Sequence, residues 1–111
     1  MKYGYIGLGN LGGHLAASLQ RNGFDLVVHD LNRDLAERHL KAGAVWAASP
    51  RAVAEQVDHV FTCLPSPAVS EAVLDNMLPA ISGKTWIENS TLGRDEILRL
   101  AGRAQASGAK V

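Results

Sequence analysis

Short, mostly apolar runs alternate with longer segments whose apolar positions recur every three or four residues. The runs predict strands at 3–6, 26–28, 44–46, 57–64 and 84–88. The longer segments predict helices at 10–22, 33–42, 50–56, 67–76 and 95–106. Strands interleaved with helices indicate right-handed βαβ units. The pattern therefore predicts an α/β fold with a doubly wound parallel sheet in the order 3-2-1-4-5.

Local signals fix several helix ends and suggest which side of two helices is buried. Asn32 is a candidate N-cap, and Ser49 and Ser66 are each followed by proline at the first helical position. The spacing predicts one buried face on the first helix and one on the last. Their members are Leu11, Leu15, Ala16 and Leu19 in the first, and Ile97, Leu98, Ala101 and Ala104 in the last.

Composition limits the chain to one ordinary globular domain. It has 111 residues, of which 47% are hydrophobic and 20% charged. Eleven basic and eleven acidic residues give zero net charge, which argues against a nucleic-acid partner. No apolar run could cross a bilayer and no secretory signal is recognisable, so a cytoplasmic location is expected. The single Cys63 and four scattered histidines predict no disulfide and no metal site.

The segment 7–12 reads Gly-Leu-Gly-Asn-Leu-Gly and matches the pattern G-x-G-x-x-G. It follows a predicted strand and opens a predicted helix, which is the context of a dinucleotide-binding loop. Gly7 would allow the tight turn, Gly9 the close approach of a pyrophosphate, and Gly12 close packing of helix on strand. The pyrophosphate would then accept hydrogen bonds from free N–H groups at the helix start. The alternative is a tight turn without a ligand.

Asp30 ends the second predicted strand, 18 residues after Gly12. A carboxylate at this position accepts hydrogen bonds from the adenosine ribose and repels a 2′-phosphate, which favours NAD over NADP. The alternative is a turn aspartate that caps the second helix. Arg33 could pair with a 2′-phosphate and so favour NADP, or it could be a solvated helix residue.

Five segments together resemble the N-terminal domain of the β-hydroxyacid dehydrogenases, the group of 3-hydroxyisobutyrate dehydrogenase, tartronate semialdehyde reductase and 6-phosphogluconate dehydrogenase. The segments are 5–12, 22–24, 28–32, 64–66 and 90–91. The resemblance implies a Rossmann fold and a set of cofactor-binding residues. They are Gly7, Leu8, Gly9, Asn10, Leu11, Gly12, Asp30, Leu31, Leu64, Pro65, Ser66 and Thr91.

The chain departs from the family at four positions, mostly on the nicotinamide side. Leu11 replaces the usual Met, Glu88 an Asp, Arg94 a Pro, and Val69 a residue that is often polar. The family's catalytic lysine, its glycine-rich substrate loop and its helical second domain would all lie beyond residue 111. None of the four lysines of this chain shows a catalytic context, so no catalytic residue is assigned.

The sequence thus predicts that residues 1–111 form a dinucleotide-binding domain. Residues 109–111 look like the start of a sixth strand, so a fragment of a longer protein is expected, although a complete edge strand is the alternative. The resemblance implies hydride transfer between NAD and a small 3-hydroxy acid, with this chain alone inactive. A non-catalytic NAD-binding module is the other interpretation. Self-association through the flank that would meet the second domain is also expected.

Overall fold

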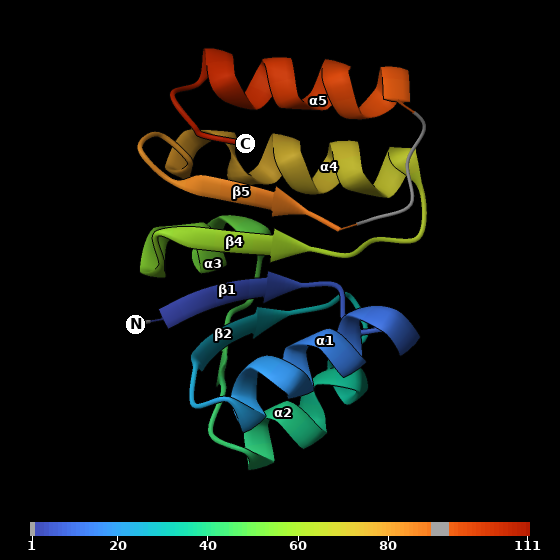
Figure 1. The fold of residues 1–111 in the computed structure, drawn as a ribbon, viewed down its shortest axis with the longest axis vertical. Coiled ribbons are helices and arrows are strands. Elements are labelled where there is room, and N and C mark those ends of the chain that lie inside the picture. Colours follow the sequence, from blue (N-terminus) through green and yellow to red (C-terminus); the bar gives the residue numbers. More distant parts are fainter. Residues whose placement is uncertain (1, 90–93) are drawn as a thin grey trace.

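The computed structural model describes residues 2–89 and 94–111 and forms a five-stranded parallel sheet in the order β3-β2-β1-β4-β5. The order and the Rossmann-like α/β class confirm the prediction (Figure 1). The strands are β1 (Lys2–Ile6), β2 (Asp25–His29), β3 (Val45–Trp46), β4 (His59–Thr62) and β5 (Thr85–Glu88). The helices are α1 (Asn10–Arg21), α2 (Glu37–Lys41), α3 (Pro50–Gln56), α4 (Pro67–Met77) and α5 (Arg94–Ala106). Two short 3₁₀ helices, η1 (Arg33–Ala36) and η2 (Leu78–Ala80), precede α2 and follow α4.

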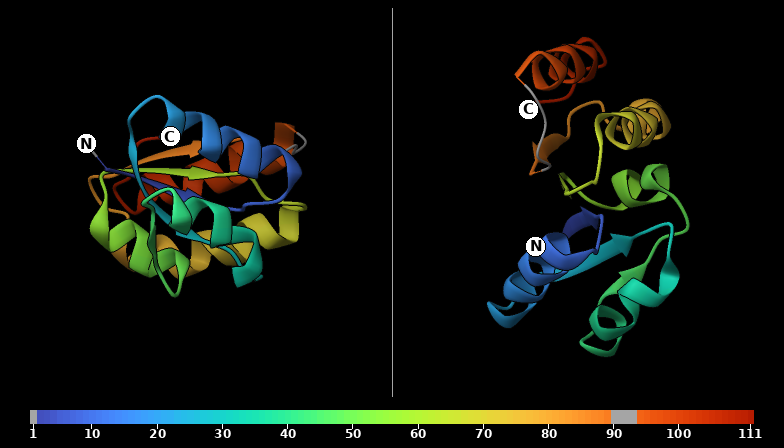
Figure 2. Two further views of the ribbon diagram at one scale, coloured as in Figure 1. Left: turned by 90° about the horizontal axis from the view of Figure 1, so that it is seen from below. Right: turned by 90° about the vertical axis from the view of Figure 1, so that its right-hand side faces the viewer.

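Helices cover the sheet from both sides. Figure 2 shows α1 on one side and α3 and α4 on the other. The core is accordingly split into two clusters by the sheet. The cluster under α1 and α2 is built on Tyr5, Leu26 and Val28, and the larger one under α3, α4 and α5 on Val27, Val60 and Trp86.

The predicted caps are confirmed by hydrogen bonds. Ser49 Oγ accepts from Ala52 N at 3.0 Å at the start of α3, and Ser66 Oγ accepts from Val69 N at 3.3 Å at the start of α4. Asn32 Oδ1 accepts from Asp34 N at 3.1 Å, where η1 begins. Each side chain satisfies an N–H group that the helix itself leaves free.

The predicted buried face of α1 is partly wrong. Leu11 is 57% exposed and Leu15 is also exposed, whereas Gly12, Gly13 and Ala16 are buried. Small residues let the helix lie close to the sheet, so the larger leucines are directed away from the contact.

The prediction for α5 is also partly wrong: of its members, Ala104 is confirmed as buried. Leu100 and Ala104 are buried, whereas Ile97 and Leu98 are exposed. The periodicity was compatible with two adjacent stripes, and packing against α4 selects the one that contains Leu100.

One further element differs from the sequence prediction, because the predicted helix 33–42 is split into η1 and α2. The start of a sixth strand expected at residues 109–111 is present as a single parallel bridge between Thr85 and Lys110. Within the described residues, no helix is both long enough and apolar enough to cross a membrane.

A reciprocal pair of hydrogen bonds joins α1 to α2. Gln20 Nε2 donates to the carbonyl oxygen of His39 at 3.0 Å, and His39 Nδ1 donates to Gln20 Oε1 at 3.1 Å. His39 is 1% exposed, and its Nε2 accepts from Arg38 Nε at 3.4 Å. Burial lowers the pKa of His39, and the positive charge of Arg38 lowers it further.

We expect this histidine to make the domain less stable in acid. The pKa of His39 is lower in the folded than in the unfolded chain, where it is about 6.5. Its contribution is therefore fully present above that value and lost as pH falls toward the folded pKa. Urea unfolding at pH 7.5 and pH 5 measures the loss. The variant His39→Asn keeps a donor near the Nδ1 position and cannot titrate, so it should lose less stability; equal losses in both proteins would contradict this role.

Candidate functional site

A cleft of about 840 Å³ lies at the edge where the parallel strands end. Ile6 at the end of β1, His29 at the end of β2, Cys63 after β4 and Asn89 after β5 all line it. In Figure 1 this is the edge to which the strand arrows point. Ligands of open α/β sheets bind at this edge, where the strand order reverses between β1 and β4.

Two of the three motif glycines are required by the packing of the protein itself. Gly7 has a φ of +98°, and a Cβ on it would overlap the carbonyl oxygen of Cys63. A Cβ on Gly12 would overlap the carbonyl oxygen of Gly7. The first and third glycines thus permit the turn and the close seating of α1 on the sheet.

The packing of the protein does not require glycine at position 9. A Cβ on Gly9 would meet no atom within 4 Å, and its backbone angles, φ −67° and ψ −162°, suit any residue. Gly9 is also the N-cap of α1 and offers no side-chain cap, in contrast to the serines of α3 and α4. The amino end of α1 therefore opens into the cleft with free N–H groups and a backbone that an anion can approach closely.

The carboxylate of Asp30 ties this loop to the end of β2. Its Oδ2 accepts from Leu8 N at 2.8 Å, and its Oδ1 accepts from Asn32 N at 2.8 Å. The cap of the following helix is Asn32 and not Asp30. Each carboxylate oxygen can accept more than one hydrogen bond, so Asp30 keeps acceptor capacity toward the cleft.

Arg33 lies over an aromatic ring. Its guanidinium carbon is 5.3 Å from the ring centroid of Trp46, and that ring is 5.3 Å from the ring of His29. Trp46 is only partly buried and contacts Arg33 by a cation–π interaction. The guanidinium of Arg33 therefore lies with one face over a ring, while the residue as a whole is exposed to solvent.

The predicted residues mostly meet at this cleft. Those that line it are Gly7, Gly9, Asn10, Leu11, Gly12, Asp30, Leu31, Leu64 and Pro65. The side chain of Leu8 is buried in the core instead, although its N–H reaches Asp30. Ser66 does not line the cleft and serves as the N-cap of α4. Thr91 lies outside the described residues.

One wall of the cleft was missed by the sequence analysis, apart from Val69. It is the face of α4 that carries Val69, Ala72, Val73 and Asn76, joined by Pro50 at the start of α3. These α4 positions follow the spacing i, i+3, i+4 and i+7 of one helix face. The spacing was visible in the sequence, but an apolar stripe does not show whether it faces the core or a ligand.

A short polar chain fixes the ends of β4 and β5 beside the cleft. Trp86 Nε1 donates to Thr62 Oγ1 at 2.8 Å, and Thr62 Oγ1 donates to Glu88 Oε2 at 2.9 Å. Glu88 stands where the family usually has Asp, and here it anchors the two strands. Burial raises the pKa of the Cys63 thiol, and the charge of Glu88 raises it further, so the thiol stays protonated.

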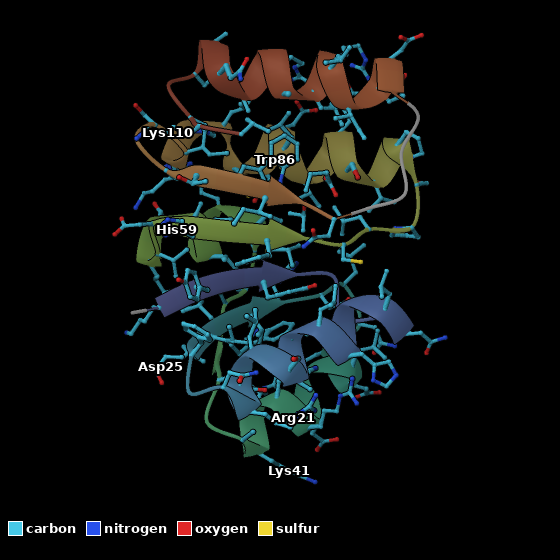
Figure 3. All side chains as sticks on the ribbon, viewed as in Figure 1. Arg21, Asp25, Lys41, His59, Trp86 and Lys110 are labelled. Carbon is cyan, nitrogen blue, oxygen red and sulfur yellow. The ribbon has the colours of Figure 1, made fainter. Side chains whose placement is uncertain are left out.

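The four lysines lie away from the cleft. Lys2 and Lys84 stand at the amino ends of β1 and β5, and Lys84 pairs with Asp58 at 3.6 Å. Figure 3 shows Lys41 and Lys110 far from the edge where the strands end. None of the four lysines is among the residues that line the cleft.

The residues present fit a dinucleotide. Three features occur in one cleft: the amino end of α1 without a side-chain cap, Gly9 with free space in place of a Cβ, and the carboxylate of Asp30 at the end of β2. These are the groups that hold a pyrophosphate and the adenosine ribose in Rossmann folds.

Comparison with known proteins agrees with this geometry. Mitochondrial 3-hydroxyisobutyrate dehydrogenase of Mus musculus is 33% identical over 110 residues, which cover 96% of this chain and 33% of that protein. The probable enzyme of the same name from Dictyostelium discoideum is 45% identical over 65 residues, or 59% of this chain and 20% of that protein. The chain spans about a third of the length of relatives such as the mouse enzyme.

Solved structures share the fold. The reductive aminase from Aspergillus terreus in complex with NADPH and ethyl levulinate superposes with a TM-score of 0.91 at 28% identity, covering 97% of this chain and 38% of that one. An imine reductase from Streptomyces aurantiacus gives a TM-score of 0.93 at 22% identity, over 99% of this chain and 39% of that one. Residues 2–111 match the family described as the NAD binding domain of 6-phosphogluconate dehydrogenase. The chain therefore belongs to this family of NAD-binding domains.

Proposed function

We propose that this chain binds the dinucleotide of an oxidoreductase that transfers a hydride between NAD and a small 3-hydroxy acid such as 3-hydroxyisobutyrate. The observation that carries the proposal is the free space at Gly9, at the start of α1, beside the Asp30 carboxylate. Named relatives of similar sequence are 3-hydroxyisobutyrate dehydrogenases, which supports the substrate class. The bound nicotinamide would accept or donate the hydride.

The chain's own residues would bind and orient the cofactor. The N–H groups at the start of α1 would hold the pyrophosphate, and Asp30 would accept hydrogen bonds from the adenosine ribose. Leu64 and Pro65 line the part of the cleft after β4, where the nicotinamide ribose would lie. Ser66 and Thr91 stay predicted contacts on that side. The proton donor and acceptor for the hydroxyl would come from outside these 111 residues.

We propose NAD and not NADP as the preferred cofactor. Asp30 would lose its ribose partners and face a like charge if a 2′-phosphate were present. The nearby cation on the segment after β2, Arg33, is stacked on Trp46. Some solved structures of the same fold are named as complexes with NADP+ or NADPH, so the choice is a feature of these residues and not of the fold.

Location and assembly remain proposals. A cytoplasmic location is proposed, whereas several relatives are named as mitochondrial. Self-association is proposed through the flank that would meet a second domain.

Calorimetric titration of the 111-residue protein with NAD tests the proposed function. We expect saturable heat at or below millimolar NAD, and much weaker binding of nicotinamide mononucleotide, which lacks the adenosine half. The same preparation should not oxidise 3-hydroxyisobutyrate, because its lysines are remote from the cleft. A folded protein that gives no heat with NAD would contradict the binding role, and measurable turnover would contradict the assignment of proton transfer to another part of the enzyme.

A further inference from the structure

Two polar side chains in the cleft are not explained by pyrophosphate or ribose binding. They are His29 at the end of β2 and Asn76 on α4. Both are held by the same segment, residues 47–51, which runs from the end of β3 into the first turn of α3. His29 Nδ1 lies 2.9 Å from the carbonyl oxygen of Ala47, and Arg51 N donates to Asn76 Oδ1 at 2.8 Å. One connection therefore orients two side chains that come from different elements.

These hydrogen bonds determine what each side chain offers to the cleft. A carbonyl oxygen only accepts, so His29 Nδ1 carries the hydrogen and Nε2 of the neutral ring is an acceptor. A backbone N–H only donates, so the atom of Asn76 that it meets is the oxygen, and Nδ2 is the remaining donor. Among residues 2–89 and 94–111, the hydrogen bonds of these two side chains involve His29 Nδ1 and Asn76 Oδ1, and Asn76 is exposed to solvent at the cleft. The two side chains thus offer the cleft one acceptor and one donor.

The surrounding wall is apolar. Many of the other residues that line the cleft are apolar, among them Leu31, Leu35, Pro50, Val69 and Val73. Leu31, next to Asp30, is 92% exposed, so it offers a large apolar surface that the domain itself does not cover. An aromatic base attached to a ribose at Asp30 would find apolar contacts here, with polar groups from His29 and Asn76.

We propose that His29 and Asn76 select adenine against purines that carry oxygen at position six. The 6-amino group of adenine donates to His29 Nε2, and a neighbouring ring nitrogen accepts from Asn76 Nδ2. A 6-oxo purine would direct an oxygen lone pair at the lone pair of Nε2 and lose one hydrogen bond. The inference rests on the proposed function, because it requires the base of a dinucleotide in this cleft.

The direct test compares NAD with nicotinamide hypoxanthine dinucleotide, in which an oxygen replaces the 6-amino group of the base. We expect the 111-residue protein to bind NAD about tenfold more tightly in a calorimetric titration, because the oxygen cannot donate to Nε2 and its lone pair is repelled there. Equal affinities for the two dinucleotides would overturn the inference and leave the proposed function intact. A folded protein that binds neither would overturn the proposed function.

Two variants assign the selectivity to these side chains. His29→Asn keeps an amide donor near the Nδ1 position for Ala47 and removes Nε2, so the preference for NAD should fall to about twofold or less. Asn76→Asp keeps an acceptor for Arg51 N and removes the donor, so NAD affinity should fall severalfold. Arg51→Gln is the matched control, because it changes the side chain of the connecting segment and retains its N–H; it should keep the tenfold preference. An unchanged preference in His29→Asn would overturn the role of His29.

Discussion

Replacing Gly9 by alanine is expected to abolish measurable NAD binding while leaving the free energy of unfolding within about 0.5 kcal/mol of the original protein. The backbone angles at Gly9 suit alanine, and the added methyl group would meet no atom of the protein within 4 Å. The methyl would instead stand where a pyrophosphate approaches the N–H groups of α1. Loss of one or two charge-assisted hydrogen bonds corresponds to about 3 kcal/mol, or roughly a hundredfold in affinity.

The matched control is Gly12→Ala, which should lose stability, whereas Gly9→Ala should lose NAD affinity and keep its stability. Its methyl group would overlap the carbonyl oxygen of Gly7, so the backbone must move and the fold should lose about 3 kcal/mol. Urea unfolding and calorimetric titration of both variants separate the two effects. NAD binding by Gly9→Ala at the original affinity would show that the pyrophosphate does not lie on this loop.

Replacing Asp30 by alanine should impair both affinity and stability. The variant loses the acceptor of Leu8 N and that of Asn32 N, and an N–H left without a partner costs about 1–3 kcal/mol. It also loses the proposed hydrogen bonds to the ribose, for a further fall in NAD affinity of at least about tenfold. The original protein should prefer NAD to NADP by at least about tenfold, and Asp30→Ala should reduce that preference.

The ratio of NAD to NADP affinity is the measurement that separates the structural role of Asp30 from its proposed role in cofactor choice. A general loss of stability weakens both cofactors alike, whereas loss of charge repulsion favours NADP alone. Arg33→Ala serves as the control and should hardly change the ratio, because its guanidinium is stacked on Trp46. Equal binding of NAD and NADP by the original protein, or an unchanged ratio in Asp30→Ala, would leave Asp30 with a structural role only.

The architecture was predictable because its determinants are local. Ser49 and Ser66, each followed by proline, mark helix starts through hydrogen bonds within three residues. Gly7 and Gly12 were assigned from spacing and context, and the structure places both at backbone contacts that exclude a side chain. The parallel order then follows from the handedness of successive βαβ units.

Other features depend on contacts between distant segments. The hydrogen bond from Leu8 N to Asp30 joins residues 22 apart, and no local pattern indicates it. The wall formed by α4 shows the same difficulty, since Val69 and Val73 have the periodicity of an ordinary buried stripe. For α1, the exposed Leu11 was misplaced because hydrophobicity alone ignores how closely glycines bring a helix to a sheet.

The two-sided bonding of Asp30 limits how the cofactor preference of such a domain can change in evolution. A substitution that admits a 2′-phosphate by removing the carboxylate also releases the glycine-rich loop, because the same group accepts from Leu8 N and Asn32 N. If the domain prefers NAD as proposed, the first step away from NAD would therefore be a step toward a less ordered pyrophosphate site. Asparagine at this position retains one acceptor oxygen without the charge, so a lineage that changes its cofactor should pass through it more readily than through alanine.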